Sequence, residues 1–322
     1  MNAARSLALG AALLAAFACA ALAQGPTPAP TTTPPPTPPG SRLITTIRNK
    51  LSANDLRSAE SAAEVYKEVQ SDDGSYLLGI SWLARGALLV GETDRAHDYV
   101  AEVRKRCEAR MARGVRTDQD DSLEIALGAA IEVEAQLRAR EKGKADAVRF
   151  LNSELARYPA PVSLRARISK RRNMLDLEGK PAPAWAVEDH AGETPQTLAA
   201  LRGRPVLVYL WDKGCGDCRA QGPTLNRVAA KYKDLAVVPI TRYYGEKPDP
   251  AADKAKMDSV WTAEYAPLGK TRVVVDANAA VAYGGSSTPT LVFIDRKGIV
   301  RRYTPTRLTE RDLTAAIELA MR

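Results

Sequence analysis

Residues 205–232 read PVLVYLWDKGCGDCRAQGPTLNRVAAKY, an apolar run followed by a short polar turn and a helical pattern. The run at 205–211 is rich in β-branched and aromatic residues, which favours a buried strand. From Cys215 onward, apolar residues recur at helical spacing, which predicts a helix that begins at the cysteines. The sequence therefore predicts a strand–turn–helix unit with two cysteines where the helix starts.

Further strands and helices alternate on either side of this unit. Apolar β-rich runs occupy 205–211, 236–244, 271–276 and 290–295, and helical patterns occupy 218–234, about 250–265 and 308–321. Such alternation is typical of a mainly parallel sheet that is covered on both faces. The segment DRKG at 295–298 predicts a hairpin turn that adds antiparallel strands at one edge. We therefore predict an α/β domain with a mixed sheet over residues 179–322.

The preceding part of the chain, residues 42–178, has a helical pattern throughout. Two similar units, at 77–107 and 123–159, each contain a glycine (Gly91 and Gly143) between two helical stretches. This pattern predicts antiparallel helical hairpins that resemble tetratricopeptide-like repeats, although the spacing of about fifty residues exceeds the usual thirty-four. The complete prediction is an α + α/β protein. The helical part either offers a surface to a partner protein or only supports the next domain.

The N-terminal segment has the character of a secretory signal. Arg5 precedes an apolar run at 7–23 that ends in small residues, and cleavage is expected near Ala23. A retained membrane anchor is the alternative, and only then would the protein contact a membrane. Residues 24–41 are rich in proline and are expected to form an extended linker. We therefore expect a soluble, exported protein in the periplasm or another extracytoplasmic compartment.

The net charge of +8 is spread over both halves of the chain. No aromatic residues interleave with a basic stripe in the sequence, so the pattern differs from that of nucleic-acid-binding surfaces. A diffuse positive charge is typical of solubility or of acidic partners. Nucleic acid is therefore not an expected partner.

The Cys-x-x-Cys pair, Cys215 and Cys218, stands where a helix is expected to begin. Unpaired backbone N–H groups and the helix dipole stabilise a thiolate at that position. The second sulfur can then attack a mixed disulfide formed by the first, which indicates a dithiol–disulfide exchange centre. A structural disulfide would close only a short loop and stabilise the fold less than a longer one would. A zinc site would need further ligands from Cys107, His97 and His190, which form no second closely spaced pair.

The C-terminal sequence resembles thioredoxin-like proteins of the TlpA/ResA branch, exported bacterial thiol-disulfide oxidoreductases. The resemblance rests on GKPAPAW, on LAALRGRPVLVYLW, on the Cys-Gly-Asp-Cys motif and on VDANAAVAYGGSSTPTLVFIDRKGIV. It implies that Cys215 attacks and Cys218 resolves, that Pro223 kinks the active-site helix, and that Pro289 is a cis-proline facing the cysteines. Thr288, Pro289 and Trp211 are the expected substrate contacts.

Several residues depart from the pattern of this branch. Asp217 replaces the usual proline between the cysteines, next to Gly216, and Gly214 replaces a tryptophan. A carboxylate about 6 Å from a thiolate opposes it by about 0.7 kcal/mol in water and by about 3 kcal/mol at an effective dielectric near 20. Lys213 and Arg219 are expected to offset part of this effect. A destabilised thiolate makes the couple more reducing, so we expect a reductant or an isomerase.

The group that takes up the proton of Cys218 is open at this stage. Thioredoxin has a buried aspartate where this chain has Tyr209, and the ResA branch often has a glutamate where this chain has Gln221. Asp217 is the remaining candidate for that role.

We therefore predict an exported thiol-disulfide oxidoreductase that needs no organic cofactor and no metal. Its expected partners are a disulfide-bearing client protein and an electron-donor thiol protein. A thiol peroxidase is one alternative, although Asp212 occupies the position of the threonine that orients peroxide in related folds. A helical adaptor with an incidental thioredoxin-like domain is another. Cys107 is expected to be a semi-buried helical thiol, or else to form an intermolecular disulfide or exchange with the active site.

Overall fold

The computed structural model describes residues 38–70, 73–245 and 248–322. The predicted signal segment 1–23 lies outside these residues, as does the predicted linker as far as Thr37. Helix α1 (Pro39–Ser52) begins within the C-terminal end of the segment predicted as linker. Proline suits the first turn of a helix, where its missing N–H has no intrahelical partner to lose.

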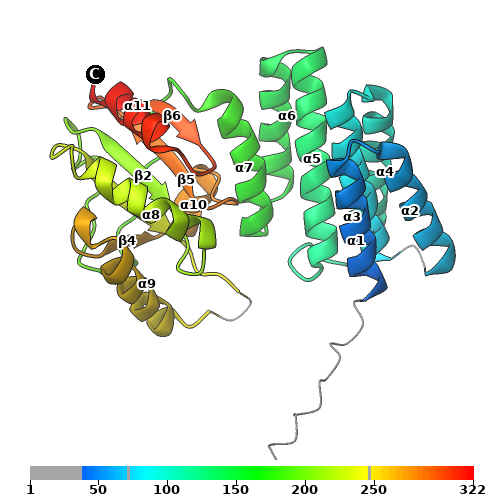
Figure 1. The fold of residues 1–322 in the computed structure, drawn as a ribbon, viewed down its shortest axis with the longest axis horizontal. Helices are drawn as coiled ribbons and strands as arrows, with labels where there is room; N and C mark the ends of the chain where they lie inside the picture. Colours follow the sequence, from blue (N-terminus) through cyan, green and yellow to red (C-terminus); the bar gives the residue numbers. More distant parts are fainter. Residues whose placement is uncertain (1–37, 71–72, 246–247) are drawn as a thin grey trace, which may run out of the picture. The chain divides into compact units, whose positions relative to one another are not determined.

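The first half of the described chain is helical, as predicted, and its helices are packed in sequence order (Figure 1). After α1 come α2 (Leu56–Val69), α3 (Gly74–Val90), α4 (Thr93–Ala112), α5 (Asp121–Glu141), α6 (Lys144–Arg157) and α7 (Val162–Asp176). The two predicted hairpins correspond to α3–α4 and α5–α6. Gly91 ends α3 in the left-handed region with φ 85°, where a residue without Cβ is favoured.

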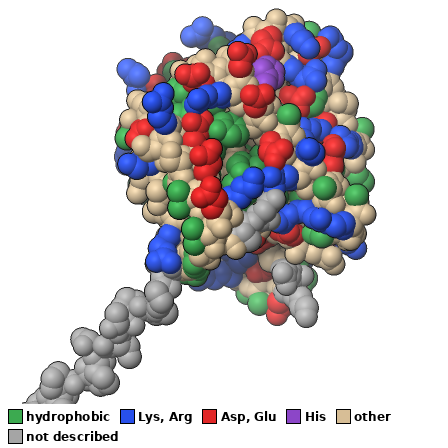
Figure 2. All heavy atoms as spheres, turned by 90° about the vertical axis from the view of Figure 1, so that its right-hand side faces the viewer, with side chains coloured by type: hydrophobic (Ala, Val, Ile, Leu, Met, Phe, Trp, Pro, Cys, Tyr) green, Lys and Arg blue, Asp and Glu red, His purple; other side chains and the backbone are tan. Residues whose placement is uncertain are grey.

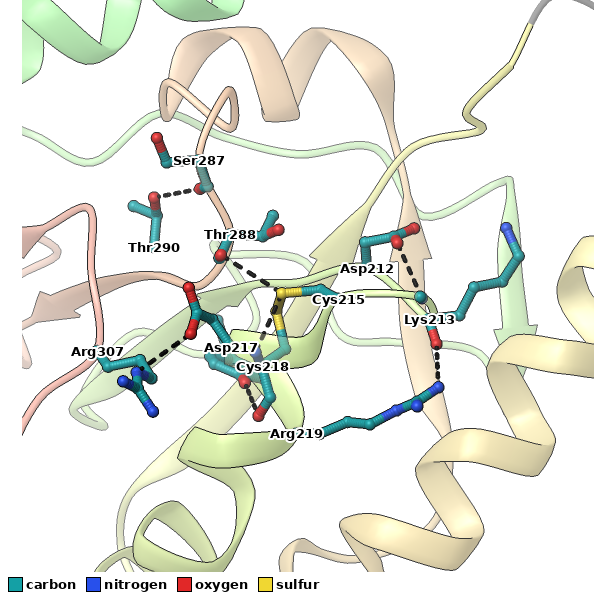
Figure 3. The surroundings of a disulfide bond; sticks show 12 residues. Asp212, Lys213, Cys215, Asp217, Cys218, Arg219, Ser287, Thr288, Thr290 and Arg307 are labelled. Atoms are coloured by element: carbon teal, nitrogen blue, oxygen red, sulfur yellow. Dashed lines mark hydrogen bonds and ion pairs between the residues drawn. A yellow bond between two sulfur atoms is a disulfide. The ribbon is translucent and has the colours of Figure 1, made fainter. Parts of the chain in front are cut away.

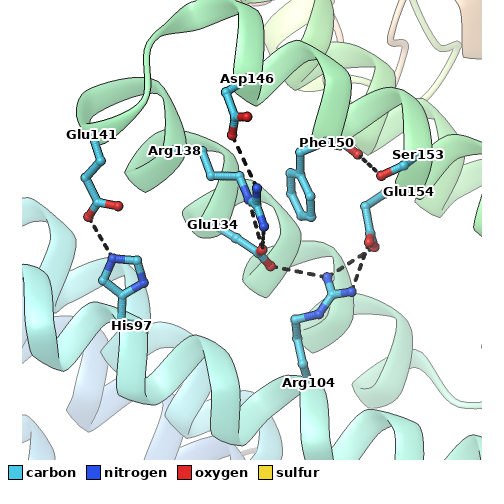
Figure 4. Close-up of polar contacts among 9 residues, drawn as sticks. All are labelled: His97, Arg104, Glu134, Arg138, Glu141, Asp146, Phe150, Ser153 and Glu154. Atoms are coloured by element: carbon cyan, nitrogen blue, oxygen red, sulfur yellow. Dashed lines mark hydrogen bonds and ion pairs between the residues drawn. The ribbon is translucent and has the colours of Figure 1, made fainter.

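Ion pairs connect the helices of these hairpins (Figure 4). Arg104 of α4 lies 2.9 Å from Glu154 of α6 and 3.5 Å from Glu134 of α5. Arg138 pairs with Glu134 at 2.9 Å, and its guanidinium lies 4.5 Å from the ring centroid of Phe150. On the face shown in Figure 2, basic and acidic side chains are interspersed. On that face, positive charge is therefore mixed with carboxylates and does not gather in one patch.

The second half forms a mixed six-stranded sheet in the order β1-β4-β3-β2-β5-β6. The strands are β1 (His190–Gly192), β2 (Val206–Leu210), β3 (Ala236–Thr241), β4 (Arg272–Val275), β5 (Thr290–Ile294) and β6 (Val300–Thr304). Strands β2, β3 and β4 are parallel, and β5 and β6 add antiparallel strands beyond β2, as the hairpin turn predicts. The three-residue strand β1 and the short helix α10 (Ala277–Ala282) were not predicted.

Helices cover both faces of this sheet. Helices α8 (Gly216–Ala229), α9 (Pro250–Glu264) and α11 (Glu310–Met321) contribute to one apolar core, and α10 contributes to the other. Along β2, Leu207 and Tyr209 join the first core, whereas Val206, Val208 and Leu210 join the second. A strand with both faces buried has no side that could be read as exposed.

Helix α7 joins the helical part to the sheet (Figure 1). Asn173 Nδ2 donates to the carbonyl of Ala282 at 2.8 Å, and Lys170 Nζ donates to Ser287 Oγ at 3.1 Å. Gly284 has φ 71°, and a Cβ there would lie 2.5 Å from the Cα of Lys170. Residues 38–322 accordingly form one compact unit. The predicted division at 178/179 falls just after α7.

None of the helices in the described residues combines the length and the apolar character needed to cross a membrane.

Candidate functional site

Cys215 and Cys218 form a disulfide at the start of α8 (Figure 3). Cys215 is the N-cap residue of that helix, and its Sγ accepts a hydrogen bond from the amide N–H of Cys218 at 3.0 Å. The side chain of Cys215 is partly exposed, whereas Cys218 is fully buried. The first sulfur therefore lies where an N–H group and the helix dipole stabilise a negative charge and where a substrate can reach it.

The turn before the cysteines is held by Asp212. Its Oδ1 accepts from the amide of Gly214 at 2.8 Å, and its carbonyl accepts from the amide of Cys215 at 3.0 Å. These contacts fix the approach of the chain to the helix. Asp212 occupies the position where peroxidases of related folds have a threonine, and one of its carboxylate oxygens is engaged in the turn.

The loop before β5 brings Thr288 and Pro289 to the cysteines. The Thr288–Pro289 peptide bond is cis, as the resemblance implies. The carbonyl oxygen of Thr288 lies 3.4 Å from Cys215 Sγ (Figure 3). Ser287 stabilises the loop, because its carbonyl accepts from Thr290 Oγ1 at 2.7 Å. A substrate chain that approaches Cys215 therefore meets the backbone of Thr288.

Trp211 requires a correction, since it was predicted to contact the substrate. Its side chain is 1% exposed and packs against Trp261 and Tyr265, with ring centroids 5.6 and 5.7 Å away. Trp211 follows Leu207 and Tyr209 in the alternation of β2 and therefore points into the same core. It belongs to the apolar core that also contains Cys218 and does not line the surface of the site.

Two buried tyrosines lie beneath Cys218. The hydroxyls of Tyr209 and Tyr265 both donate to the carbonyl oxygen of Cys218, at 3.1 and 2.8 Å. Burial raises the pKa of both phenols above their ordinary range. Because they stay protonated, they hold the first turn of α8 as hydrogen-bond donors and do not take up a proton.

Gln221 is also buried, at 1% exposure. Its Oε1 accepts from the amide of Leu308 at 2.7 Å and so ties α8 to the loop before α11. The positions where relatives have acids are thus occupied by a neutral tyrosine and a neutral amide that have structural partners.

The charged residues around the cysteines pair differently from the prediction. Lys213 Nζ lies 2.8 Å from Asp253, and Arg219 Nε lies 3.2 Å from Glu264. Both cations pair with other carboxylates, which neutralise part of the charge expected to offset Asp217, and that offset stays a prediction. Asp217 instead has Arg307 at 3.4 Å (Figure 3), and its side chain is 68% exposed. Arg307 comes from the loop before α11, about ninety residues away, and no local pattern marked it.

The remaining predicted residues of α8 are in the expected places. Pro223 lies inside the helix, which continues to Ala229. Gly216 is the first residue of α8, and a Cβ there would meet no described atom within 4 Å. Packing therefore does not require glycine at this position, and the role of Gly216 in tuning the cysteines stays a prediction.

Cys107 lies in the core of the helical part, not at a semi-buried position. It is fully buried on α4, and burial raises the pKa of its thiol to about 12. The other candidate zinc ligands are also on separate elements: His97 pairs with Glu141 at 2.7 Å (Figure 4), and His190 lies on β1. Within the described ranges, no cluster of three or more His, Cys, Asp or Glu side chains is arranged to hold a metal ion.

Comparison with known proteins concerns the same part of the chain. Residues 177–317 match the family model Redoxin. The chain is 36% identical over 124 residues to the thiol:disulfide interchange protein DsbE of Pseudomonas fluorescens biotype C, which covers 38% of this chain and 64% of that relative. It is 25% identical over 143 residues to the thioredoxin-like protein YneN of Bacillus subtilis, with 44% and 79% covered.

Among solved structures, a thiol:disulfide interchange protein of the thioredoxin family from Chlorobium tepidum TLS is 17% identical, with a TM-score of 0.36. That match covers 45% of this chain and 98% of the other. The match to the DsbE relative spans just under two thirds of that protein's length.

Proposed function

We propose that the protein is a thiol-disulfide oxidoreductase, because residues 177–317 match the Redoxin family model and contain the Cys215–Cys218 disulfide. Cys215 is the attacking thiolate, and Cys218 is the resolving thiol. Thr288 and Pro289 line the approach of the substrate.

The unequal exposure of the two sulfurs carries this proposal. Cys215 is partly exposed at a helix N-terminus, 3.4 Å from the carbonyl of Thr288, whereas Cys218 is completely buried. An external disulfide can therefore reach only the first sulfur directly. The second can act only within the protein, on a mixed disulfide already formed at Cys215.

The exchange follows from this arrangement. The Cys215 thiolate attacks one sulfur of the substrate disulfide, forms a mixed disulfide and releases the other substrate sulfur as a thiolate. Cys218 then loses its proton and attacks Cys215, which forms the protein disulfide and releases the second substrate thiolate. The substrate gains two electrons and the protein dithiol loses them. We assign the uptake of the Cys218 proton to Asp217, because Tyr209 and Gln221 remain neutral.

The expected direction is reduction or isomerisation of a client's disulfides. Asp217 opposes the thiolate at Cys215, but Arg307 and solvent screen it, so its effect is expected near the lower end of the range given above. The protein then needs a donor dithiol to reduce Cys215–Cys218 again and no organic cofactor or metal. The apolar segment 7–23 supports the proposal that this exchange occurs outside the cytoplasm.

The test is the reduction of a disulfide-linked peptide by pre-reduced protein. The wild-type protein should convert the peptide with single-turnover stoichiometry. Cys218→Ser should accumulate the mixed disulfide at Cys215, which mass spectrometry would identify. A mixed disulfide that formed at Cys218 in the Cys215→Ser variant, at the wild-type rate, would contradict the assigned roles.

A further inference from the structure

A cavity of about 370 Å³ lies between the helices and the loop that carries Thr288. Helices α5 and α7 contribute Glu124, Arg167 and Lys170 to its wall. The sheet region contributes Arg242, Tyr244 and Thr288. The helical part of the chain thus forms one wall of a cavity whose opposite wall includes the loop that carries Thr288.

Thr288 lies between this cavity and the reactive sulfur of Cys215. Its carbonyl oxygen is 3.4 Å from Cys215 Sγ, and the same residue lines the cavity. Lys170 of α7 donates to Ser287 Oγ at 3.1 Å, so this wall is held directly against the substrate-binding loop. A substrate side chain in the cavity would therefore belong to a residue close in sequence to the cysteine whose sulfur is bound at Cys215.

The lining of the cavity is mainly cationic. Arg167, Lys170 and Arg242 face a single lining carboxylate, Glu124. Buried Glu132 lies behind the wall, 2.9 Å from Arg167 and 3.5 Å from Lys170, and neutralises part of their charge. It does not form an ion pair with Arg242 in the described structure.

Arg242 is the cation with donor capacity left for a ligand. Its guanidinium lies 4.2 Å from the ring centroid of Tyr244, and Nη1 donates to the carbonyl of Tyr243 at 3.4 Å. Its Nε is buried and has no hydrogen-bond partner among the described residues. Because that nitrogen has almost no accessible surface, a ligand would meet the outer Nη groups of Arg242, which lines the cavity.

We propose that this cavity binds a carboxylate that the substrate carries close to its disulfide. The inference rests on the proposed function and names the class of substrate: an acidic residue beside a client cysteine, or the carboxylate of a small disulfide such as oxidised glutathione. The planar fork of Arg242 suits a carboxylate, and Lys170 and Arg167 add charge. The helical part of the chain then selects substrates in addition to supporting the sheet.

Substrates that differ in a single side chain test the inference. Pre-reduced protein is mixed with peptide disulfides that are identical except for Glu, Gln or Lys beside the cysteine, and the first turnover is timed. The Glu peptide should react about tenfold faster than the Gln peptide, and the Lys peptide should be slowest. Equal rates for the Glu and Gln peptides would overturn the inference for polypeptide substrates.

Variants locate the effect. Arg242→Gln should bring the ratio of Glu to Gln rates close to one, and Arg242→Lys should leave an intermediate ratio, because it keeps the charge but loses the fork. Arg149→Gln is the matched control, because Arg149 lies on α6 and pairs with Asp146. The control should leave the ratio unchanged. An unchanged ratio in Arg242→Gln would contradict the assignment to this cavity.

Two further comparisons separate the possible sources of the carboxylate and the two proposals. Oxidised glutathione should react faster than its neutral ester if small disulfides are the source, and the peptide series should show the preference if client proteins are.

Binding of redox-inert S-methyl peptides to the oxidised protein gives a readout that does not depend on exchange. Tighter binding of the Glu peptide than of the Gln peptide supports the inference even if no disulfide is reduced. The lack of reduction would then overturn only the proposed function. Equal rates in both series together with equal affinities would overturn the inference.

Discussion

Cys107 and Cys215 are the same residue type in opposite surroundings. Cys107 lies in the middle of α4, fully buried among apolar side chains, and burial raises the pKa of its thiol to about 12. Cys215 lies at the start of α8, partly exposed, with the amide of Cys218 3.0 Å from its sulfur. Position within a helix and access to solvent therefore separate a packing residue from a reactive one.

The first prediction concerns alkylation. In reduced native protein, iodoacetamide at pH 8 should modify Cys215 and leave Cys107 unmodified until the protein unfolds. With a pKa of about 12, only about one Cys107 in ten thousand is a thiolate at that pH. Mass spectrometry after timed quenching measures both rates. Comparable alkylation rates for the two cysteines in the folded protein would contradict the distinction between a packing cysteine and a reactive one.

The second prediction concerns the exchange reaction. Cys215→Ser should lower peptide-disulfide reduction by about a thousandfold or more, because the attacking sulfur is lost. Cys107→Ala should leave the rate unchanged, as a buried thiol outside the site has no part in it. A loss of activity in Cys107→Ala, in protein that remains folded, would show that the helical thiol takes part in exchange.

The third prediction concerns stability and its pH dependence. Cys107→Ala should lower the free energy of unfolding by about 1–2 kcal/mol at pH 8, since it leaves a small cavity. The folded state favours the neutral thiol, because its pKa is raised from 9.0 to about 12. This contribution is complete below pH 9 and is lost as the pH rises from 9 toward 12. The wild-type advantage should therefore shrink by about 1.4 kcal/mol between pH 8 and pH 10.

Urea unfolding at pH 8 and pH 10 measures this effect. Both proteins should carry Cys215→Ser and Cys218→Ser, so that no disulfide exchange accompanies unfolding. A wild-type advantage that grows with pH would contradict the assigned sign.

The smallest effect is expected at Asp217. Asp217→Asn removes a negative charge near the thiolate, so it should raise the reduction potential of the Cys215–Cys218 couple by about 15 mV. Arg307→Gln removes the partner of Asp217 and should lower the potential by less than that. Equilibration with glutathione measures both shifts. A lower potential in Asp217→Asn would show that the carboxylate acts on the couple in another way.

Much of the sheet region could be predicted from the sequence, because its central strands are continuous apolar runs bounded by turn residues. Strand β1 was missed since three residues carry no periodicity, and α10 was missed since it is barely more than one turn. Trp211 was misplaced for a different reason. Both faces of β2 are buried, so alternation along that strand cannot distinguish the surface from the core.

In the candidate site, too, some residues could be predicted from the sequence and others could not. Cys215 and Cys218 are adjacent on one turn, and their spacing alone indicates exchange chemistry. Arg307 and Arg242 could not be found from local patterns, because loops far away in the sequence bring them to the site. The arrangement of Lys170 and Arg167 depends on the packing of α7 against the loop before β5, which no residue pattern in the chain describes.

The most direct test of the account is the redox equilibrium of the Cys215–Cys218 pair. The protein is equilibrated in glutathione buffers, thiols are trapped, and mass spectrometry counts them at each cysteine. The account predicts that the two thiols appear together with a midpoint below about −220 mV, while Cys107 stays reduced throughout. A pair that never changed state across the series would contradict the account.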